Sequence, residues 1–187
     1  MAGSYPKFNA FDVLRVFLKI EKDNARVTLV KDTGIGEGTM RTILNLLKDK
    51  RLITSNRQGH SLTKKGQLLK DELSSIVESS EFKDDKIFSG KRKFVFWVKK
   101  PDHNKPIYEE RDIAVKNGAD AALIFGYDNR LRLPGMEKFD TRKLENLFPY
   151  QKGDILLMIA SVDENPGLAV VSELNSKLKE IMTTISR

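Results

Sequence analysis

Residues 35–53 read IGEGTMRTILNLLKDKRLI and indicate how the first half of the chain folds. Apolar residues recur in this stretch at helical spacing, at Met40, Ile43, Leu44 and Leu47. The spacing predicts a helix over residues 37–50 that buries this apolar stripe.

The other side of this predicted helix is polar and, between Glu37 and Asp49, free of acids. Its short side chains allow a close approach to a groove. Gly38 lowers the stability of the predicted helix by about 1 kcal/mol relative to alanine. It either permits close approach of the backbone to a phosphate or is tolerated at a fraying helix end. The polar face consists of Thr39, Arg41, Thr42, Asn45 and Lys48.

Two shorter helices are predicted upstream. Asn9 caps the first, which has an apolar face and ends at residues 23–24. The second covers residues 26–32 and buries Val27 and Val30 or their neighbours. Residues 33–36 form a tight connection in which Gly34 and Gly36 can adopt positive φ.

A hairpin and another helix are predicted downstream. Residues 52–57 form a strand, residues 58–60 a turn and residues 61–63 the partner strand. Thr63 then caps a helix from residue 64 to about residue 80.

The order helix, short helix, turn, helix, hairpin, helix resembles a winged helix-turn-helix domain. Residues 35–53 are similar to the recognition helix of bacterial and archaeal winged-helix regulators, and residues 62–66 (LTKKG) match the Leu-Thr-x-x-Gly signature that follows the wing. Residues 8–80 resemble the N-terminal domain of the central glycolytic gene regulator family. They also resemble an uncharacterised archaeal family with a C-terminal domain of unknown function. Arg51 departs from the pattern, which usually has glycine there.

The resemblance implies that the domain binds double-stranded DNA with the helix at 37–50 in the major groove. Arg41 would contact guanine and Asn45 adenine, while Thr39 and the helix N-terminus would hold a phosphate. The alternative for each of these residues is that its side chain is solvated at the protein surface and contacts no DNA. The expected DNA-binding residues are Lys31, Glu37, Thr39, Arg41, Thr42, Asn45, Lys48, Asn56, Arg57, His60, Lys64 and Lys65.

The charge distribution agrees with a nucleic-acid partner. The chain has a net charge of +7, and residues 26–65 hold nine Lys and Arg against three Asp and Glu. A basic excess also serves solubility, so its location has to decide between the two interpretations.

The second half reads as a separate α+β domain at residues 94–187, joined to the domain at 1–80 by a polar linker at 81–93. Strands are predicted at 94–98, 121–125, 130–133 and 154–160. Helices are predicted at 105–117, 141–147 and from 165 to about 183. The whole chain is therefore predicted to be α+β, with a winged helix-turn-helix domain first.

Several classes of function find no support in the sequence. The chain lacks cysteine and has only two histidines, which excludes thiolate chemistry and disfavours a zinc site. No nucleotide motif or convincing catalytic constellation appears, so we expect no enzyme and no cofactor. No apolar run could span a bilayer and residues 1–7 are no secretory signal, so we expect a cytoplasmic protein without membrane contact.

The sequence thus predicts a transcriptional regulator that binds double-stranded DNA as a homodimer, with a C-terminal sensor or dimerisation domain. A small-molecule effector would lie near Ser161, Asp163 and Asn165, although these residues equally suit a helix N-terminus without a ligand. The alternative is a winged-helix module for protein interaction or RNA-associated assembly that has no operator.

Overall fold

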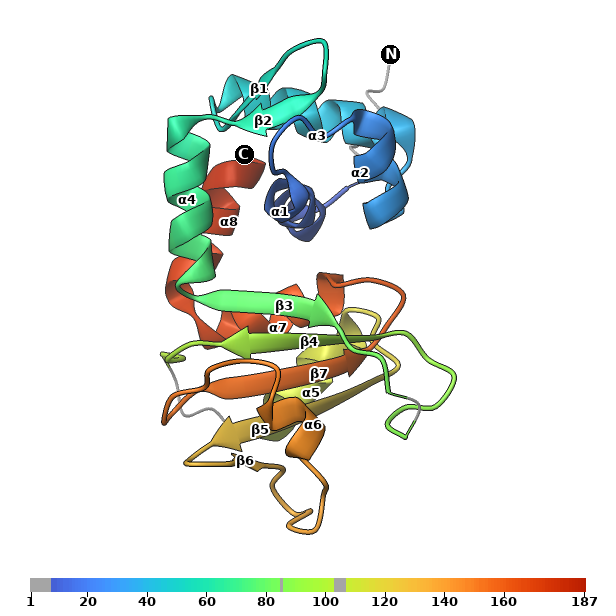
Figure 1. Cartoon of the computed structure of the whole chain (residues 1–187), viewed down its shortest axis with the longest axis vertical. Helices are drawn as coiled ribbons and strands as arrows, with labels where there is room; N and C mark the ends of the chain where they lie inside the picture. Colours follow the sequence, from blue (N-terminus) through green and yellow to red (C-terminus); the bar gives the residue numbers. More distant parts are fainter. Residues whose placement is uncertain (1–7, 85, 103–106) are drawn as a thin grey trace. The chain divides into compact units, whose positions relative to one another are not determined.

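The computed structural model describes residues 8–84, 86–102 and 107–187 and shows a mixed α+β protein (Figure 1). Within those residues it has eight helices and two antiparallel sheets. The chain forms two compact units. Unit 1 holds the chain up to Glu72 together with Glu180–Arg187, and unit 2 holds Leu73–Lys179.

Unit 1 follows the element order that the sequence predicts. Its elements are α1 (Ala10–Lys19), α2 (Arg26–Thr33), α3 (Glu37–Asp49), the hairpin strands β1 (Ile53–Ser55) and β2 (His60–Leu62), and α4 (Lys64–Ser74). The apolar faces of α1 and α3 supply most of its core, which includes Val13, Leu14, Phe17, Met40, Ile43 and Leu47.

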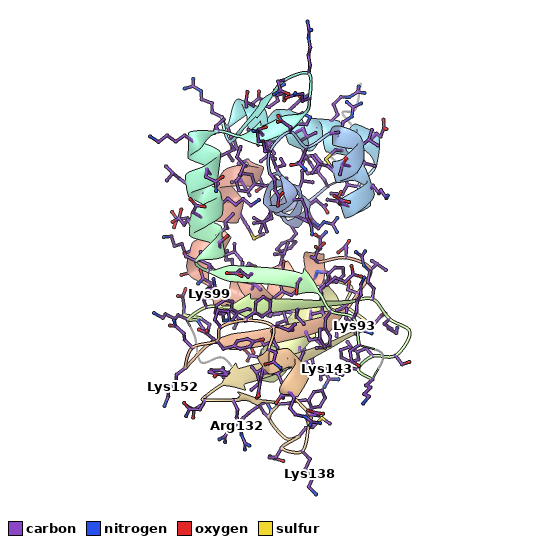
Figure 2. All side chains as sticks on the ribbon, in the orientation of Figure 1. Lys93, Lys99, Arg132, Lys138, Lys143 and Lys152 are labelled. Atoms are coloured by element: carbon purple, nitrogen blue, oxygen red, sulfur yellow. The ribbon has the colours of Figure 1, made fainter. Side chains whose placement is uncertain are left out.

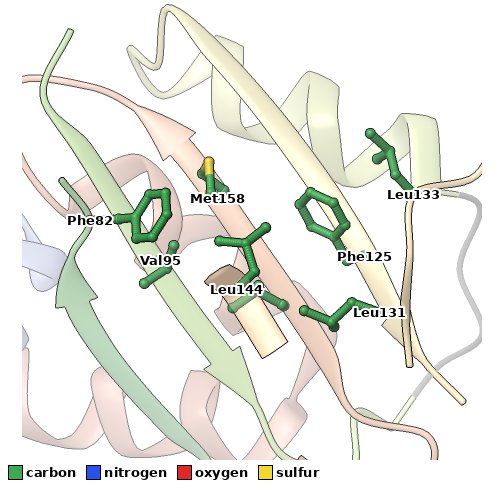
Figure 3. Close-up of a cluster of buried hydrophobic side chains, with 8 residues drawn as sticks. Phe82, Val95, Phe125, Leu131, Leu133, Leu144 and Met158 are labelled. Atoms are coloured by element: carbon green, nitrogen blue, oxygen red, sulfur yellow. The ribbon is translucent and has the colours of Figure 1, made fainter. Parts of the chain in front are cut away.

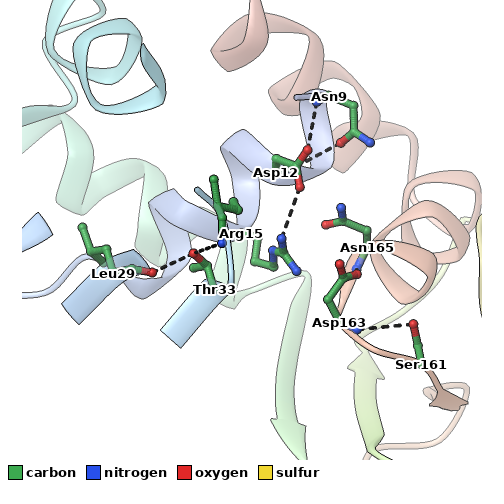
Figure 4. Close-up of polar contacts among 9 residues, drawn as sticks. Asn9, Asp12, Arg15, Leu29, Thr33, Ser161, Asp163 and Asn165 are labelled. Atoms are coloured by element: carbon green, nitrogen blue, oxygen red, sulfur yellow. Dashed lines mark hydrogen bonds and ion pairs between the residues drawn. The ribbon is translucent and has the colours of Figure 1, made fainter. Parts of the chain in front are cut away.

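Local hydrogen bonds explain where α1 begins and where α2 ends (Figure 4). The Asn9 side chain accepts from the Asp12 amide and Asp12 accepts from the Asn9 amide, each at 3.0 Å, which confirms Asn9 as the cap. At the end of α2, the Thr33 hydroxyl donates to the Leu29 carbonyl at 2.6 Å. Gly34 then turns the chain with a φ of +70°.

Of the residues expected to be buried by α2, which were Val27 and Val30 or their neighbours, it is the neighbour Leu29 that the core takes up. Val27 is 66% exposed, whereas Leu29 is fully buried. The apolar pattern of α2 is too weak to fix which side faces inward, because the helix is short and polar. Its packing against α1 and α3 decides the orientation instead.

Unit 2 is built on a five-stranded sheet with the strand order β3-β4-β7-β5-β6 (Figure 1). Helices α5 and α7 pack against each other and on one face of the sheet. The other face carries a cluster that includes Phe82, Val95 and Leu144 of α6 (Figure 3). The elements are β3 (Val77–Glu81), β4 (Lys93–Val98), α5 (Ile107–Lys116), β5 (Ala121–Tyr127), β6 (Leu131–Arg132), α6 (Arg142–Glu145), β7 (Ile155–Ala160) and α7 (Asn165–Leu174).

Both faces of the central strands are covered, which explains their continuous apolar sequences. All six residues of β4 are buried. Gly167 of α7 lies against the Phe96 ring, and a Cβ on the glycine would collide with that ring. Glycine at this position therefore allows α7 to approach the sheet closely.

The predicted helix over residues 64–80 is too long. Helix α4 ends at Ser74, and Val77–Glu81 form an edge strand that pairs with β4, Val77 opposite Val98 and Glu81 opposite Phe94. The expected linker at 81–93 is consequently wrong as well. Glu81 and Lys93 belong to neighbouring strands of one sheet, and the residues between them connect these strands.

The last predicted helix is two helices. Asn175, with a φ of −142°, ends α7, and its side chain accepts from the Leu178 amide at the start of α8 (Ser176–Ser186). Asparagine favours such a cap over a helix interior. The expected start of α5 at residues 105–106 lies outside the described residues.

Candidate nucleic-acid interface

Helix α3 divides into the two faces that its sequence predicts. Met40, Ile43, Leu44 and Leu47 are buried. Thr39 is half-buried at the boundary between the two faces. The solvent-facing side chains are those of Glu37, Arg41, Thr42, Asn45, Lys48 and Asp49.

The N-terminus of α3 is exposed and has no side-chain cap. Gly36 occupies the cap position, where it has no side chain with which to bond the first-turn amides. Gly36, Glu37 and Gly38 are all exposed. The Thr42 hydroxyl bonds back to the Gly38 carbonyl at 3.2 Å. This end of the helix therefore presents peptide N–H groups to solvent.

The C-terminus of α3 closes in a Schellman motif. The Leu52 amide donates to the Leu47 carbonyl at 3.0 Å, and the Arg51 amide donates to the Lys48 carbonyl at 2.8 Å. Arg51 adopts a φ of +57°, the left-handed conformation in which the winged-helix pattern has glycine. The turn thus forms despite the departure at Arg51.

The Leu-Thr-x-x-Gly signature has a structural explanation. The Thr63 hydroxyl accepts from the Gly66 amide at 3.0 Å and donates to the Arg51 carbonyl at 2.7 Å. It thereby caps α4 and fastens this helix to the end of α3. A Cβ on Gly66 would collide with the Leu52 carbonyl, so the signature glycine permits the close contact.

The β1–β2 hairpin is anchored to the connection between α1 and α2. Asn24 and His60 exchange two backbone hydrogen bonds of 2.9 Å. The Asp23 carboxylate accepts from the Ser61 hydroxyl and from the Asn56 side chain, each at 3.2 Å. No local pattern indicates this role for Asp23 and Asn24, which the sequence predicts only as the end of the first helix.

Asn56 is engaged within the hairpin turn. Its side-chain oxygen accepts from the amides of Gln58 and Gly59, at 2.8 and 2.9 Å, while its amide nitrogen donates to Asp23. Arg57, at the tip, is exposed, and its side chain makes no hydrogen bond or ion pair within the described part of the chain. The hairpin thus holds Asn56 in place and leaves Arg57 free to reach outward.

His60 of the hairpin lies within the electrostatic influence of Lys48 on α3. Its Nδ1 lies 2.7 Å from the Ser55 hydroxyl. Partial burial lowers the pKa of His60 below 6.5, and the positive charges of Lys48 and Arg26 lower it further. Lys48 on α3 and His60 on the hairpin therefore share one positively charged region.

The remaining expected cations are placed around these elements. Lys31 is exposed near the end of α2, and Lys64 and Lys65 are exposed at the start of α4. Lys65 donates to the Lys50 carbonyl at 3.0 Å, which adds a bond at the C-terminal end of α3.

The expected ligand residues of unit 2 make local turn contacts (Figure 4). The Asp163 amide donates to the Ser161 hydroxyl at 3.4 Å, and the Asn165 amide donates to the Asp163 carboxylate at 2.9 Å. These bonds favour the interpretation as the entry to α7. No group of three or more His, Asp or Glu residues is arranged for a metal ion in the described residues. None of the helices described has the length and apolar content needed to cross a membrane.

Comparisons with known proteins give a family match and a structural relative. A model of the N-terminal domain of PH0730-like proteins matches residues 11–68. The chain is similar to a solved structure of the hypothetical protein PH0730 from Pyrococcus horikoshii OT3, with 25% identity and a TM-score of 0.76. The similarity covers 96% of this chain and 100% of that one. No curated protein matches.

Proposed function

We propose that unit 1 is a winged helix-turn-helix domain that binds double-stranded DNA, with α3 as the recognition helix and the β1–β2 hairpin as the wing. One observation carries the proposal. Helix α3 buries its apolar stripe in the core of its own unit and leaves Arg41, Asn45 and Lys48 exposed on its other side. A major groove admits an α-helix with this distribution of side chains.

The side chains of α3 divide by chemistry into base readers and phosphate contacts. Arg41 can donate two hydrogen bonds to guanine O6 and N7, and Asn45 can pair with adenine N6 and N7. The uncapped amides at the N-terminus of α3 attract a phosphate through the helix dipole, assisted by Thr39. Lys48 lies too near the C-terminal end of α3 to share that phosphate. It contacts the DNA backbone further along the groove.

The wing supplies a second contact. Arg57 is exposed at its tip, and an arginine there can enter a minor groove or bind phosphates. The hydrogen bonds of Asn56 hold the turn that presents Arg57, so Asn56 supports the wing tip in addition to its expected contact with DNA. Phosphate contacts are added at the edges of the surface formed by α3 and the hairpin, by Lys31, Lys64 and Lys65.

The chain would act as a transcriptional regulator and as a homodimer. Dimeric helix-turn-helix proteins bind two half-sites whose centres are about 34 Å apart, so their operators repeat the two-fold symmetry of the protein. Unit 2 would then serve for dimerisation or for sensing a small molecule.

The test is a selection of bound sequences from random duplex DNA by the full chain, followed by titrations of the selected duplex at several salt concentrations. We expect an enriched, two-fold symmetric sequence and an affinity that falls steeply with salt. An Arg132→Ala variant, which changes an exposed arginine of unit 2, should bind as the wild type does. Absence of enrichment, or equal binding of duplex RNA, would refute an operator-binding function.

A further inference from the structure

A hollow in unit 2 lies where the chain leaves β3 and enters β4, at residues 81–84 and 91–93. It has a volume of about 350 Å³, within the range of small-molecule sites. The hollow is lined by Glu81, Phe82, Lys83, Asp84, Lys91, Arg92 and Lys93. Four of these seven residues are cationic and two are acidic, so the lining carries a net positive charge.

Lys93 is the distinctive residue of this hollow. It is the first residue of β4, beside the connection (Figure 2), and only 3% of its surface is exposed. Its ammonium donates to the Phe88 carbonyl at 3.4 Å, longer than an ordinary hydrogen bond. No carboxylate partner is found for Lys93 in the described portion of the chain. An ammonium has three donors, so two of them are left for another acceptor.

The acidic residues of the hollow already have cationic partners. Arg92 donates to both oxygens of Glu81, at 2.9 and 3.3 Å, and this pairing raises the pKa of Arg92. The Lys143 Nζ lies 2.6 Å from the Asp84 Oδ2, and this hydrogen bond lowers the pKa of the Asp84 carboxyl. Lys91 is likewise paired with Asp120 at 2.8 Å. Neither acid of the lining therefore neutralises Lys93.

The Lys93 side chain is buried beside apolar side chains. Its side chain shares a sheet face with Val95, which belongs to the same apolar cluster as Phe82 (Figure 3). Placing an ammonium beside such a cluster costs free energy unless its donors are bonded. An anion in the hollow would supply the missing acceptors. Lys83, which is exposed at the rim, would add a second positive charge.

We propose that this hollow binds the phosphate group of a small phosphorylated molecule, with Lys93 as the direct contact. A phosphate monoester offers three terminal oxygens and nearly two negative charges, which suits a compact donor such as lysine. Because only 3% of the Lys93 surface is exposed, the ligand has to be small enough to enter the hollow. This proposal is independent of DNA binding by unit 1.

The experiment is calorimetric titration of the full chain with inorganic phosphate and with glycerol 3-phosphate, at constant ionic strength. Glycerol serves as the uncharged control. The decisive variant is Lys93→Met, which removes the ammonium and keeps an apolar side chain of similar length. Lys138→Met, at an exposed lysine of the same unit, is the matched control (Figure 2).

We expect saturable binding by the wild type, at least tenfold weaker binding by Lys93→Met and unchanged binding by Lys138→Met. Without phosphate, Lys93→Met should be as stable as the wild type or more so, because it no longer buries an ammonium. If Lys93→Met does not fold, the exposed variant Lys83→Met decides, with an expected weakening of about threefold. Absence of saturable binding, equal loss in Lys138→Met, or full affinity in Lys93→Met or in Lys83→Met would overturn the proposal.

Discussion

Gly66 passes so close to Leu52 that a Cβ on the glycine would collide with the Leu52 carbonyl oxygen. This contact joins the first turn of α4 to the segment that follows α3. We expect Gly66→Ala to lower the free energy of unfolding by about 1–3 kcal/mol, because the backbone would have to shift. Urea denaturation measures the change.

Gly38 is the matched control for Gly66. A Cβ at Gly38 would meet nothing within 4 Å, and the residue lies in the first turn of α3. Gly38→Ala should therefore raise stability by up to about 1 kcal/mol. Equal effects of the two substitutions would contradict the role of the close contact at Gly66.

Arg51 adopts an unfavourable backbone conformation in the Schellman motif that ends α3. Its φ of +57° costs a non-glycine residue about 1–2 kcal/mol. Arg51→Gly should recover about 1 kcal/mol of stability, since part of the gain is lost to the greater freedom of glycine in the unfolded chain. Arg51→Ala, which keeps the strain, should give no such gain in the same denaturation experiment.

Arg41 is expected to read a base. Arg41→Ala should weaken binding to the selected duplex by about 1–3 kcal/mol and relax the preference at one base position. Fluorescence anisotropy on the selected duplex and on a scrambled one separates the two effects. If both duplexes lose affinity equally, Arg41 contacts a phosphate instead.

Lys64 is expected to contact the phosphate backbone. Lys64→Ala should weaken binding to all duplexes by a similar factor and reduce the slope of log affinity against log salt by about 1. Lys152→Ala, at an exposed lysine of unit 2 that pairs with Asp128, is the control and should leave the slope unchanged. A slope that Lys64→Ala does not alter would place this lysine outside the interface.

His60 reports the electrostatic potential at the wing. Burial and the charges of Lys48 and Arg26 hold its pKa below 6.5 in the free protein. DNA phosphates nearby would offset these charges and raise the pKa. Binding would then take up a proton, and affinity would increase as the pH falls through the interval between the two pKa values. NMR titration of the imidazole with and without duplex measures both.

In the free protein, the free energy of unfolding changes with pH in the opposite direction to the DNA affinity. The unfolded chain, whose histidine has the ordinary pKa, binds more protons than the folded protein just below pH 6.5. The contribution of His60 to stability is therefore fully present above pH 6.5 and decreases as the pH falls. His60→Gln should remove both pH dependences. An imidazole pKa that saturating duplex does not change would place the wing away from the phosphates.

Part of the candidate interface follows directly from sequence spacing. Met40, Ile43 and Leu47 recur with the helical period, so the side of α3 that stays exposed could be predicted. The role of Asn56 could not, because its partner Asp23 lies 33 residues earlier. Lys93 was also missed as a site residue. Lys93 bonds to Phe88, which packs with Ile87 against the cluster on the sheet, and both of these residues lie in the segment predicted to be a linker.

The sequence alone determined the helices whose apolar residues repeat with a clear period, the Asn9 cap and the chain reversal at Gly34, because these depend on residues within one or two turns of each other. The tertiary structure decided that Val77–Glu81 form a strand instead of continuing α4. Those residues have no strong period of their own, and their backbone groups are satisfied by β4, whose paired residues lie 13 to 21 positions further along the chain. Where local preferences are weak, the hydrogen bonds and burial that a distant segment supplies select the conformation.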